Sequence, residues 1–374
     1  MNPLRRLAAA LSAAAILSLS APAGPGGGLA AAPLTVVDPG QGAVALPKGA
    51  TAASELSGLA WTGGSSWLAV GDNGAKVLWQ VEAGIDVATG RILTSTVSGS
   101  IAAPALGSDS EGIAYRPDLG GVWVTDEVAS TIIPVALPGG VAPSAVTVPA
   151  IYTPANVQSN MGLESLAWSG STLWTANEEA LVPDGAVSTT TAGSLVRIQR
   201  FDAAGTATGQ WAYRTDPIAA MNPFITQERS GVVDIVTWSA TTLLVLEREL
   251  GGAIVPTFRS RLYAVDVAGA ADVSAVASLL DPGVTPLTKT LLWERSFASS
   301  NFEGMSWGPE AGGGRSLVLV SDDGGGMTQS LYALVVVPEP GPLLLPLAAA
   351  GTALLIAAVR RMRRAGRTGG TSAA

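Results

Sequence analysis

Short apolar runs alternate with turn-forming residues along most of the chain, and five stretches share one design. Each consists of an apolar segment, a turn and a second apolar segment, with acidic residues at the two outer ends. The stretches are SELSGLAWTGGSSWLAVGDNG from Ser54, SDSEGIAYRPDLGGVWVTDE from Ser108, GLESLAWSGSTLWTANEE from Gly162, VVDIVTWSATTLLVLERE from Val232 and NFEGMSWGPEAGGGRSLVLVSDDGG from Asn301. This pattern predicts five β-hairpins.

The hairpins recur at intervals that indicate a repeat architecture. Their leading acids, Glu55, Glu111, Glu164, Asp234 and Glu303, are 56, 53, 70 and 69 residues apart. Further strand-like segments follow the hairpins, at Lys76–Val81, Ser194–Phe201, Arg261–Val267 and Ser330–Val337. Several short strands in each repeat of this length are typical of a β-propeller blade. We therefore predict one all-β propeller over residues 33–337, with five or six blades, closed by Thr35–Val37 pairing beside Ser330–Val337.

Composition supports this fold class and narrows the chemistry. Of the 374 residues 48% are hydrophobic, and Gly (45) and Pro (24) are abundant, which suits short strands joined by turns. The chain has no Cys, so disulfides, thiol catalysis and Cys-ligated zinc are excluded. It has no His, which excludes a Ser-His-Asp triad and a His-ligated metal. Carboxylates remain, and their oxygens suit Ca²⁺ better than a transition metal.

The acids at the hairpin ends form the candidate site. The start of the first strand and the end of its antiparallel partner are neighbours, so each leading acid should meet a trailing one, and all pairs should converge on one mouth of the channel. The candidate metal ligands are Glu55, Asp72, Glu111, Asp126, Glu164, Asp234, Glu247, Glu303 and Asp322, and the candidate catalytic residues are Glu111, Glu164, Glu303 and Asp322. The alternative interpretation is that the leading acids only cap the hairpins by hydrogen-bonding turn amides.

Two further residue sets accompany the acids. Lys76, Arg248 and Arg261 are candidate phosphate contacts, with charge balance for the acids as the alternative role. One aromatic residue ends each first strand, and because these positions repeat regularly we predict that they belong to the core between blades. These aromatic residues are Trp61, Tyr115, Trp168, Trp238 and Trp307.

The two ends of the chain carry targeting features. Residues 1–32 combine Arg5 and Arg6 with an apolar run and an Ala-Pro-Ala exit, which predicts a secretory signal peptide. Residues 338–374 begin with Pro338, Glu339 and Pro340, continue with the uncharged run Gly341–Val359, which is long enough for a transmembrane helix, and end with an Arg cluster. The cluster contains Arg360, Arg361, Arg363, Arg364 and Arg367. The alternative is a plain single-pass membrane anchor, which would need only the uncharged run and the Arg cluster.

All three parts together, in this order, resemble the PEP-CTERM sorting signal of Gram-negative bacteria. The resemblance implies export across the inner membrane, transient anchoring and processing by an exosortase. It also implies a final place at the cell surface or in the extracellular matrix, in the exopolysaccharide context of biofilms.

Without its two ends the body has 14 basic and 28 acidic residues, a net charge of −14. Such a charge argues against nucleic acid and anionic membranes as partners of the body and favours cations, or anions that arrive with cations. Contact with the membrane is therefore expected only through the C-terminal helix.

The hairpin motifs, in their order, resemble the phytase-like domain named for an esterase-like activity of phytase. The resemblance covers about residues 52–336 and rests mainly on GLESLAW…LWTANEEAL, LLVLERELG…RSRLYAVDV and NFEGMSWGP…LVLVSDDGG. It implies a Ca²⁺-dependent phosphoric ester hydrolase. A non-enzymatic propeller that binds polysaccharide or a surface protein is the alternative, and a propeller lactonase is a third reading.

Overall fold

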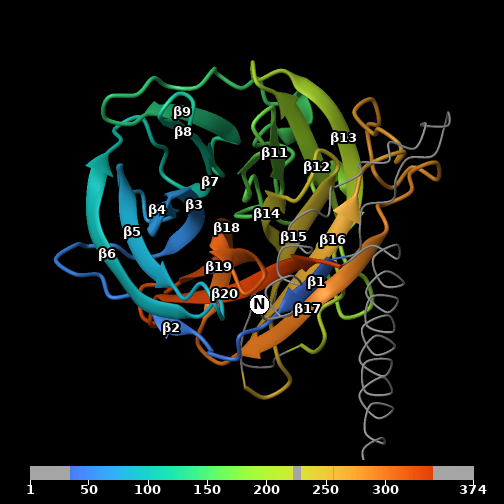
Figure 1. Ribbon diagram of the computed structural model, residues 1–374. Helices are drawn as coiled ribbons and strands as arrows, with labels where there is room; N and C mark the ends of the chain where they lie inside the picture. The colour runs from blue at the N-terminus through green and yellow to red at the C-terminus, as the bar shows by residue number, and fades with distance from the viewer. Residues whose placement is uncertain (1–33, 222–228, 256, 340–374) are drawn as a thin grey trace, which may run out of the picture. The chain divides into compact units, whose positions relative to one another are not determined.

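Each predicted hairpin forms the inner strands of its own antiparallel sheet in the computed structural model, which describes residues 34–221, 229–255 and 257–339 (Figure 1). The first sheet contains β3 (Leu56–Gly63), β4 (Ser66–Gly71), β5 (Val77–Ile85) and β6 (Ile92–Ala102); the second contains β7 (Ser110–Arg116), β8 (Gly121–Asp126) and β9 (Thr131–Ala136). The third contains β10 (Ala167–Trp168), β11 (Thr172–Ala176), β12 (Leu195–Asp202) and β13 (Ala207–Arg214). The fourth contains β14 (Arg229–Thr237), β15 (Thr242–Gly251), β16 (Thr257–Asp266) and β17 (Lys289–Phe297).

The fifth sheet joins the two ends of the described chain. It contains β18 (Asn301–Ala311), β19 (Gly314–Asp322) and β20 (Ser330–Pro338), and β1 (Leu34–Val37) pairs with β20 as its outermost strand. The pair Thr35↔Val337 lies in this register, so the predicted closure by Thr35–Val37 is confirmed. The short β2 (Val44–Ala45) also pairs with β20. A ring closed in this way requires the first and last strands of the described residues to pair with each other.

The fold is therefore an all-β five-bladed propeller. The described residues contain five sheets and no sixth, which decides between the five and six blades that the spacing allowed. The longer intervals hold loops instead, including the 3₁₀ turn η2 (Val182–Asp184) in the third blade and the connection from β16 to β17 in the fourth. A second 3₁₀ turn, η1 (Ala150–Tyr152), lies between the second and third blades.

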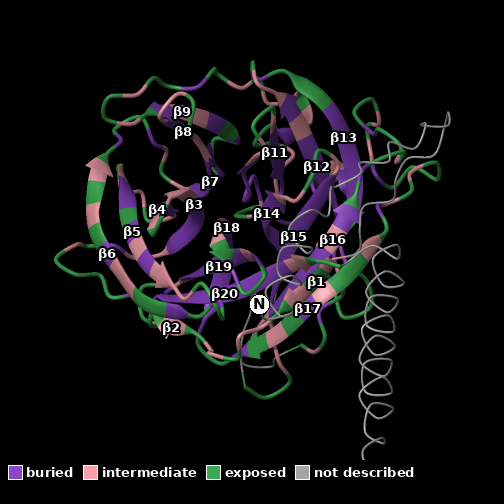
Figure 2. Ribbon diagram, in the orientation of Figure 1, coloured by how far each residue is buried: buried purple, intermediate pink, exposed green. Residues whose placement is uncertain are grey.

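The core lies between neighbouring blades. Figure 2 shows the inner and middle strands largely buried, whereas the outer strands β6 and β17 alternate between buried and exposed positions. Each blade packs its apolar faces against the next one; Trp67 and Val320, for example, belong to one cluster that joins the first and fifth blades. Alternation of buried and exposed positions along a strand is the expected burial pattern of stacked antiparallel sheets.

Glycine allows the inner strands to meet at the centre. A Cβ atom on Gly304 would lie 2.3 Å from the backbone oxygen of Ser57, and one on Gly58 would lie 2.1 Å from that of Glu111. A Cβ atom on Gly112 would be 2.6 Å from the carbonyl carbon of Ser165. No side chain fits at such separations, so the inner strands of four blades are in backbone contact at this level. Along these strands the contacts lie between the leading acids and the aromatic positions.

The predicted signal peptide (residues 1–32) and most of the predicted sorting tail, including Pro340, the run Gly341–Val359 and the Arg cluster, lie outside the described residues. In the described part of the chain, no helix has the length and apolarity needed to cross a membrane. Pro338 and Glu339 are described: Pro338 ends β20, and Glu339 accepts a hydrogen bond from the Thr35 hydroxyl at 2.8 Å.

Candidate metal site at the acidic mouth of the channel

One end of the channel opens into a cavity of about 730 Å³, which we call the acidic mouth. Five of the nine predicted metal ligands line it: Asp72, Glu111, Glu164, Glu303 and Asp322. They come from the first, second, third and fifth blades, so the predicted convergence of leading and trailing acids is seen for these residues. Arg248, Arg229, Asn160 and Asn301 also contribute to the lining.

Irregular strand pairing points two of the leading acids toward the mouth. The register between β7 and β8 shifts between Ser110 and Ile113, and the register between β18 and β19 shifts between Phe302 and Gly304. Glu111 and Glu303 lie within these β-bulges. A bulge places an extra residue in one strand and re-aims its side chain, which explains how an acid in an inner strand comes to face the channel opening.

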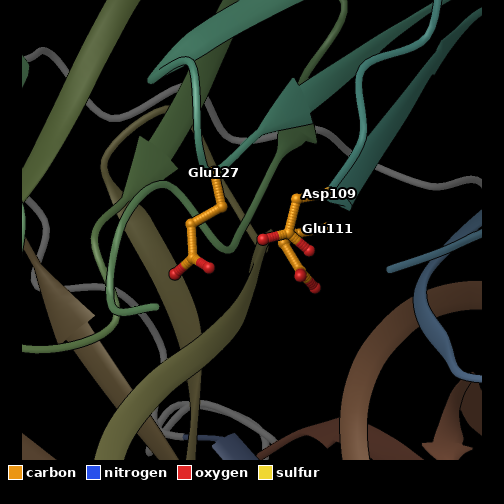
Figure 3. Close-up of side chains that lie close together, drawn as sticks. All are labelled: Asp109, Glu111 and Glu127. Carbon is orange, nitrogen blue, oxygen red and sulfur yellow. The ribbon is translucent and has the colours of Figure 1, made fainter. Parts of the chain in front are cut away.

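Glu127 belongs to two groups of neighbouring carboxylates, which together we call the acidic cluster. Carboxylate oxygens of Asp109, Glu111 and Glu127 lie within 4.8 Å of one another, and the same holds for Glu127, Glu164 and Glu178. Figure 3 shows the first three side chains close together where β7 begins and β8 ends. Two oxygens that each contact one Ca²⁺ ion at about 2.4 Å are at most about 4.8 Å apart, so both groups have the spacing of a ligand set.

Glu178 is the most deeply buried carboxylate of this cluster. It has no solvent exposure, and neither of its oxygens has a hydrogen-bond partner among the described residues. The nearest cation is Arg248, whose Nη2 lies 3.2 Å from Glu178 Oε1 and 2.6 Å from Glu303 Oε1. Arg229 Nη1 is 3.7 Å from Glu178 Oε2. Buried carboxylate oxygens without donors are costly, so this site suits an additional cation.

The electrostatics of the mouth favour protonated carboxyl groups when no cation is bound. Burial raises the pKa values of Glu111 and Glu164 well above the ordinary glutamate value, and neighbouring carboxylates raise them further. Burial likewise raises the pKa of Asp72 and of Glu127 to about 8. Burial raises the pKa of Glu303 to about 7, although Arg248 acts in the opposite direction.

The prediction for Asp126 is corrected by one residue. The Asp126 carboxylate accepts the amide of Ala129 at 2.6 Å and lies against Gly107, so it serves as a turn cap. Glu127 pairs with Asp109 through their backbones at 3.0 Å, and its side chain joins the cluster. Because successive side chains of an extended chain point in opposite directions, an error of one residue selects the wrong side.

Asp234 is also a cap and not part of the mouth. It is 3% exposed, and its carboxylate accepts the amides of Ile235 at 2.8 Å and Met305 at 2.6 Å. Burial raises its pKa well above the ordinary aspartate value. For this residue the capping alternative is correct, since the carboxylate joins the inner strands of the fourth and fifth blades.

Glu247 points away from the mouth, between the third and fourth blades. It accepts hydrogen bonds from the Tyr213 hydroxyl at 2.5 Å, the Asp216 amide at 2.9 Å and Lys289 Nζ at 2.5 Å. Burial raises its pKa, and Lys289 opposes that effect. The next residue on β15, Arg248, faces the mouth instead, so the fourth blade contributes a cation where the other blades contribute acids.

The leading acid of the first blade is replaced by a serine. Aligning the five motifs on their aromatic residue places Ser57, and not Glu55, at the position of Glu111 and Glu303. The Ser57 hydroxyl donates to the backbone oxygen of Ser110 at 3.0 Å. Glu55 does not line the mouth; its backbone amide donates to the Asp323 carboxylate, and its φ angle is 51°.

The three predicted phosphate contacts have different environments. Arg248 lines the mouth between Glu178 and Glu303. Arg261 is buried between Glu249 at 2.5 Å and Glu294 at 2.9 Å, outside the mouth, so charge balance is its role. Lys76 donates to the backbone oxygens of Leu106 and Gly107, so it is a structural contact as well.

The predicted set omitted Asp109, Glu127, Glu178 and Arg229. For three of them a signal was present, because each lies at an outer end of a repeated hairpin: Asp109 and Glu127 in the second stretch, and Glu178 in the third. Arg229 carried no signal, because it enters the mouth through the start of β14, ahead of the repeated motif.

A match to a known family model shows the family to which this chain belongs. The family model described as "Phytase-like: Esterase-like activity of phytase" matches residues 51–325, which include every residue of the acidic mouth. The chain belongs to this phytase-like family. The matched region contains the first four blades and the inner hairpin of the fifth, so the resemblance of the sequence motifs is confirmed over most of the propeller.

The phytase-like chain was also compared with individual proteins. No curated protein matches it. Among solved structures, the crystal structure of a nidogen/laminin complex contains a chain that is similar with 12% identity and a TM-score of 0.36, covering 82% of this chain and 98% of the other.

Proposed function

We propose that this phytase-like propeller is an exported, calcium-dependent phosphoric ester hydrolase whose site is the acidic mouth together with the carboxylate groups that adjoin it. The observation that carries the proposal is the pair of three-carboxylate groups that share Glu127 beside a 730 Å³ cavity. The all-oxygen donor set fits a hard cation, and so do the buried oxygens of Glu178, which accept no hydrogen bond from the described residues. We assign Asp109, Glu111, Glu127, Glu164 and Glu178 as the Ca²⁺ ligands.

Other residues of the mouth suit the remaining tasks of a phosphoester hydrolase. Calcium, when bound, would neutralise phosphate charge and lower the pKa of a water molecule. Arg248, which has a buried Nε without a partner among the described residues, is assigned to phosphate binding. Glu303, with a pKa of about 7, can exchange a proton near neutral pH and is assigned as the general base.

The test is hydrolysis of a chromogenic phosphomonoester by the purified protein in chelator and in rising Ca²⁺. We expect turnover that requires Ca²⁺ and a calcium-dependent rise in melting temperature; a hundred-fold excess over Kd would add about 2.7 kcal/mol to the free energy of unfolding. Glu127→Gln should remove both effects because Glu127 belongs to both ligand groups. The double variant with Glu164→Gln and Glu303→Gln should also lose the thermal response.

Glu82→Gln is the matched control, because Glu82 accepts hydrogen bonds from Ser65 and Ser66 away from the mouth. It should respond to calcium as the parent does. Calcium binding without turnover would contradict the hydrolase and support a binding propeller. A parent protein without any calcium response would contradict the metal site, and the acids would then be structural.

Export and sorting complete the proposal and rest on the sequences of the two ends. Residues 1–32 act as the signal peptide, and residues 338–374 are removed by an exosortase at the surface of a Gram-negative cell. Mass spectrometry of the secreted or surface form tests this. A mature protein that retains Arg360–Arg364 would contradict processing and favour a simple membrane anchor.

A further inference from the structure

The opposite end of the channel holds a second, smaller cavity of about 120 Å³, which we call the aromatic end. All five inner strands line it, and it shares no lining residue with the acidic mouth. Its aromatic residues are Trp61, Tyr115, Trp168 and Trp307. Along the inner strands, the backbone contacts at Gly58, Gly112 and Gly304 lie between the residues that line the two cavities.

The aromatic residues were predicted to belong to the core between blades. Part of the surface of each packs in that core, and another part lines the cavity. Trp61, Tyr115, Trp168 and Trp307 are half-buried and pack against the apolar clusters between blades. The indole N–H of Trp61 donates to Gly64 O at 3.1 Å, and that of Trp307 donates to Thr237 O at 3.0 Å. With these donors occupied, the two indoles offer the cavity apolar ring surface.

Arg315, on β19, places a cation at this cavity. Its guanidinium carbon lies 4.7 Å from the ring centre of Trp307 and 5.5 Å from that of Trp61. Within the described residues no carboxylate lies within 4.0 Å of its guanidinium, and the one hydrogen bond of its side chain is a 3.4 Å contact from Nε to Gly308 O. Burial lowers its pKa, and the charge of Glu310 only partly compensates.

The environment of the half-buried Arg315 differs from that of the fully buried arginines. Arg197, Arg248 and Arg261 each contact a carboxylate at 2.6 Å or less. A guanidinium has five N–H donors in a planar fork that matches a carboxylate, so Arg315 retains donors that a ligand can use. An arginine held between two indoles is also pre-oriented, which reduces the entropy lost on binding.

We propose that the aromatic end binds a single six-membered ring that carries a carboxylate, either a hexuronic acid unit or an aromatic acid. The ring enters the aromatic cavity, whose volume is close to the roughly 150 Å³ of an apolar cavity that holds benzene. The carboxylate pairs with Arg315. The cavity is too small for a second ring, so a longer ligand would insert only its terminal unit.

The test is calorimetry and ligand-observed NMR on the purified protein in chelator, with glucuronate and benzoate as acids and with glucose and benzyl alcohol as neutral counterparts. We expect saturable binding of at least one acid, at least about tenfold tighter than its neutral counterpart, because a hydrogen-bonded ion pair is lost in the latter. Binding of glucuronate would indicate a hexuronic acid unit as the ligand, and binding of benzoate would indicate an aromatic acid.

Arg315→Met should abolish the difference between acid and neutral ligand, and Arg315→Lys should restore part of it. Arg200→Met is the matched control, because Arg200 stacks on Trp174 and Trp211, outside the cavity. Its ligand affinity should equal that of the parent.

Three results would overturn the proposal. These are no saturable binding of either acid by the parent, equal affinity for acid and neutral ligand, or an equal loss of affinity in Arg200→Met. Circular dichroism and the melting temperature of each variant show whether a loss of binding reflects unfolding. If the Arg315→Met variant does not fold, the Arg315→Lys variant is the test of the proposal. A folded lysine variant that binds the acid with parental affinity would contradict a role for the planar guanidinium.

Discussion

Arg248 Nη2, on the second strand of the fourth blade, donates to Glu303 Oε1, on the inner strand of the fifth blade, at 2.6 Å. The two residues are 7% and 12% exposed in their side chains, so this ion pair is largely shielded from water. It joins two blades across the acidic mouth. It also keeps the pKa of Glu303 at about 7, lower than burial alone would leave it.

Replacing Arg248 should therefore destabilise the protein strongly when calcium is absent. Arg248→Met leaves Glu303 and Glu178 without their nearest cation, and removal of one partner of a buried pair reduces the free energy of unfolding by about 3–5 kcal/mol. Urea unfolding in chelator measures the loss. Arg259→Met is the control, since Arg259 forms a half-exposed pair with Glu294 at 3.8 Å and should lose at most about 1 kcal/mol. Similar losses in both variants would contradict a special role for the mouth.

The calcium-free protein should become less stable as the pH rises from about 5 to 8. Asp72, Glu127 and Glu303 have folded-state pKa values of about 8, 8 and 7, above those of the unfolded chain. The folded state therefore binds more protons than the unfolded state in this window. The stability from these groups is fully present below pH 4 and is lost as the pH rises through the folded-state pKa values. A loss of at least about 1 kcal/mol would lower the melting temperature by about 2 °C or more.

Thermal melts in chelator from pH 5 to 8.5 check this expectation. Saturating Ca²⁺ should flatten the profile, because a bound cation takes the place of the protons. Stability that rises with pH across this range in chelator would show that the carboxyl groups are ionised in the folded protein.

Calcium binding near pH 7 should release protons. Metal ligands must be deprotonated, and burial holds the pKa of Glu127 at about 8, so part of this group is protonated before the ion binds. Calorimetric titration in two buffers with different ionisation enthalpies gives the number of protons released, which should fall as the pH rises through about 8, the pKa of Glu127. A binding enthalpy that is independent of the buffer at pH 7 would argue against a protonated cluster.

Gly304→Ala should weaken the closure of the ring. The added Cβ atom would lie 2.3 Å from Ser57 O, which forces the first and fifth blades apart. Overpacking of this kind reduces the free energy of unfolding by about 1–3 kcal/mol. Gly283→Ala is the control, because no atom lies within 4 Å of its added Cβ. Thermal denaturation that does not distinguish the two variants would contradict backbone contact at the centre.

The repeated hairpins by themselves determined the fold class and the pairing of β1 with β20. Apolar periodicity and turn residues are local properties, and five copies of one strand–turn–strand pattern cannot bury their apolar faces except by packing blade against blade. The absence of His and Cys, also a property of sequence alone, restricted any metal site to oxygen ligands. Five of the nine predicted carboxylates line the mouth. Their convergence could be predicted because antiparallel pairing brings strand ends together.

The tertiary structure alone decided which acids face the channel. Asp126 and Glu127 are adjacent and chemically alike, yet one caps a turn and the other joins the cluster, because side-chain direction depends on β-bulges and register that the motif does not reveal. Asp234 occupies the same motif position as Glu303, but its shorter side chain accepts the backbone amides of Ile235 in its own blade and Met305 in the neighbouring blade. Contacts between blades are non-local, so a pattern within one repeat cannot specify them.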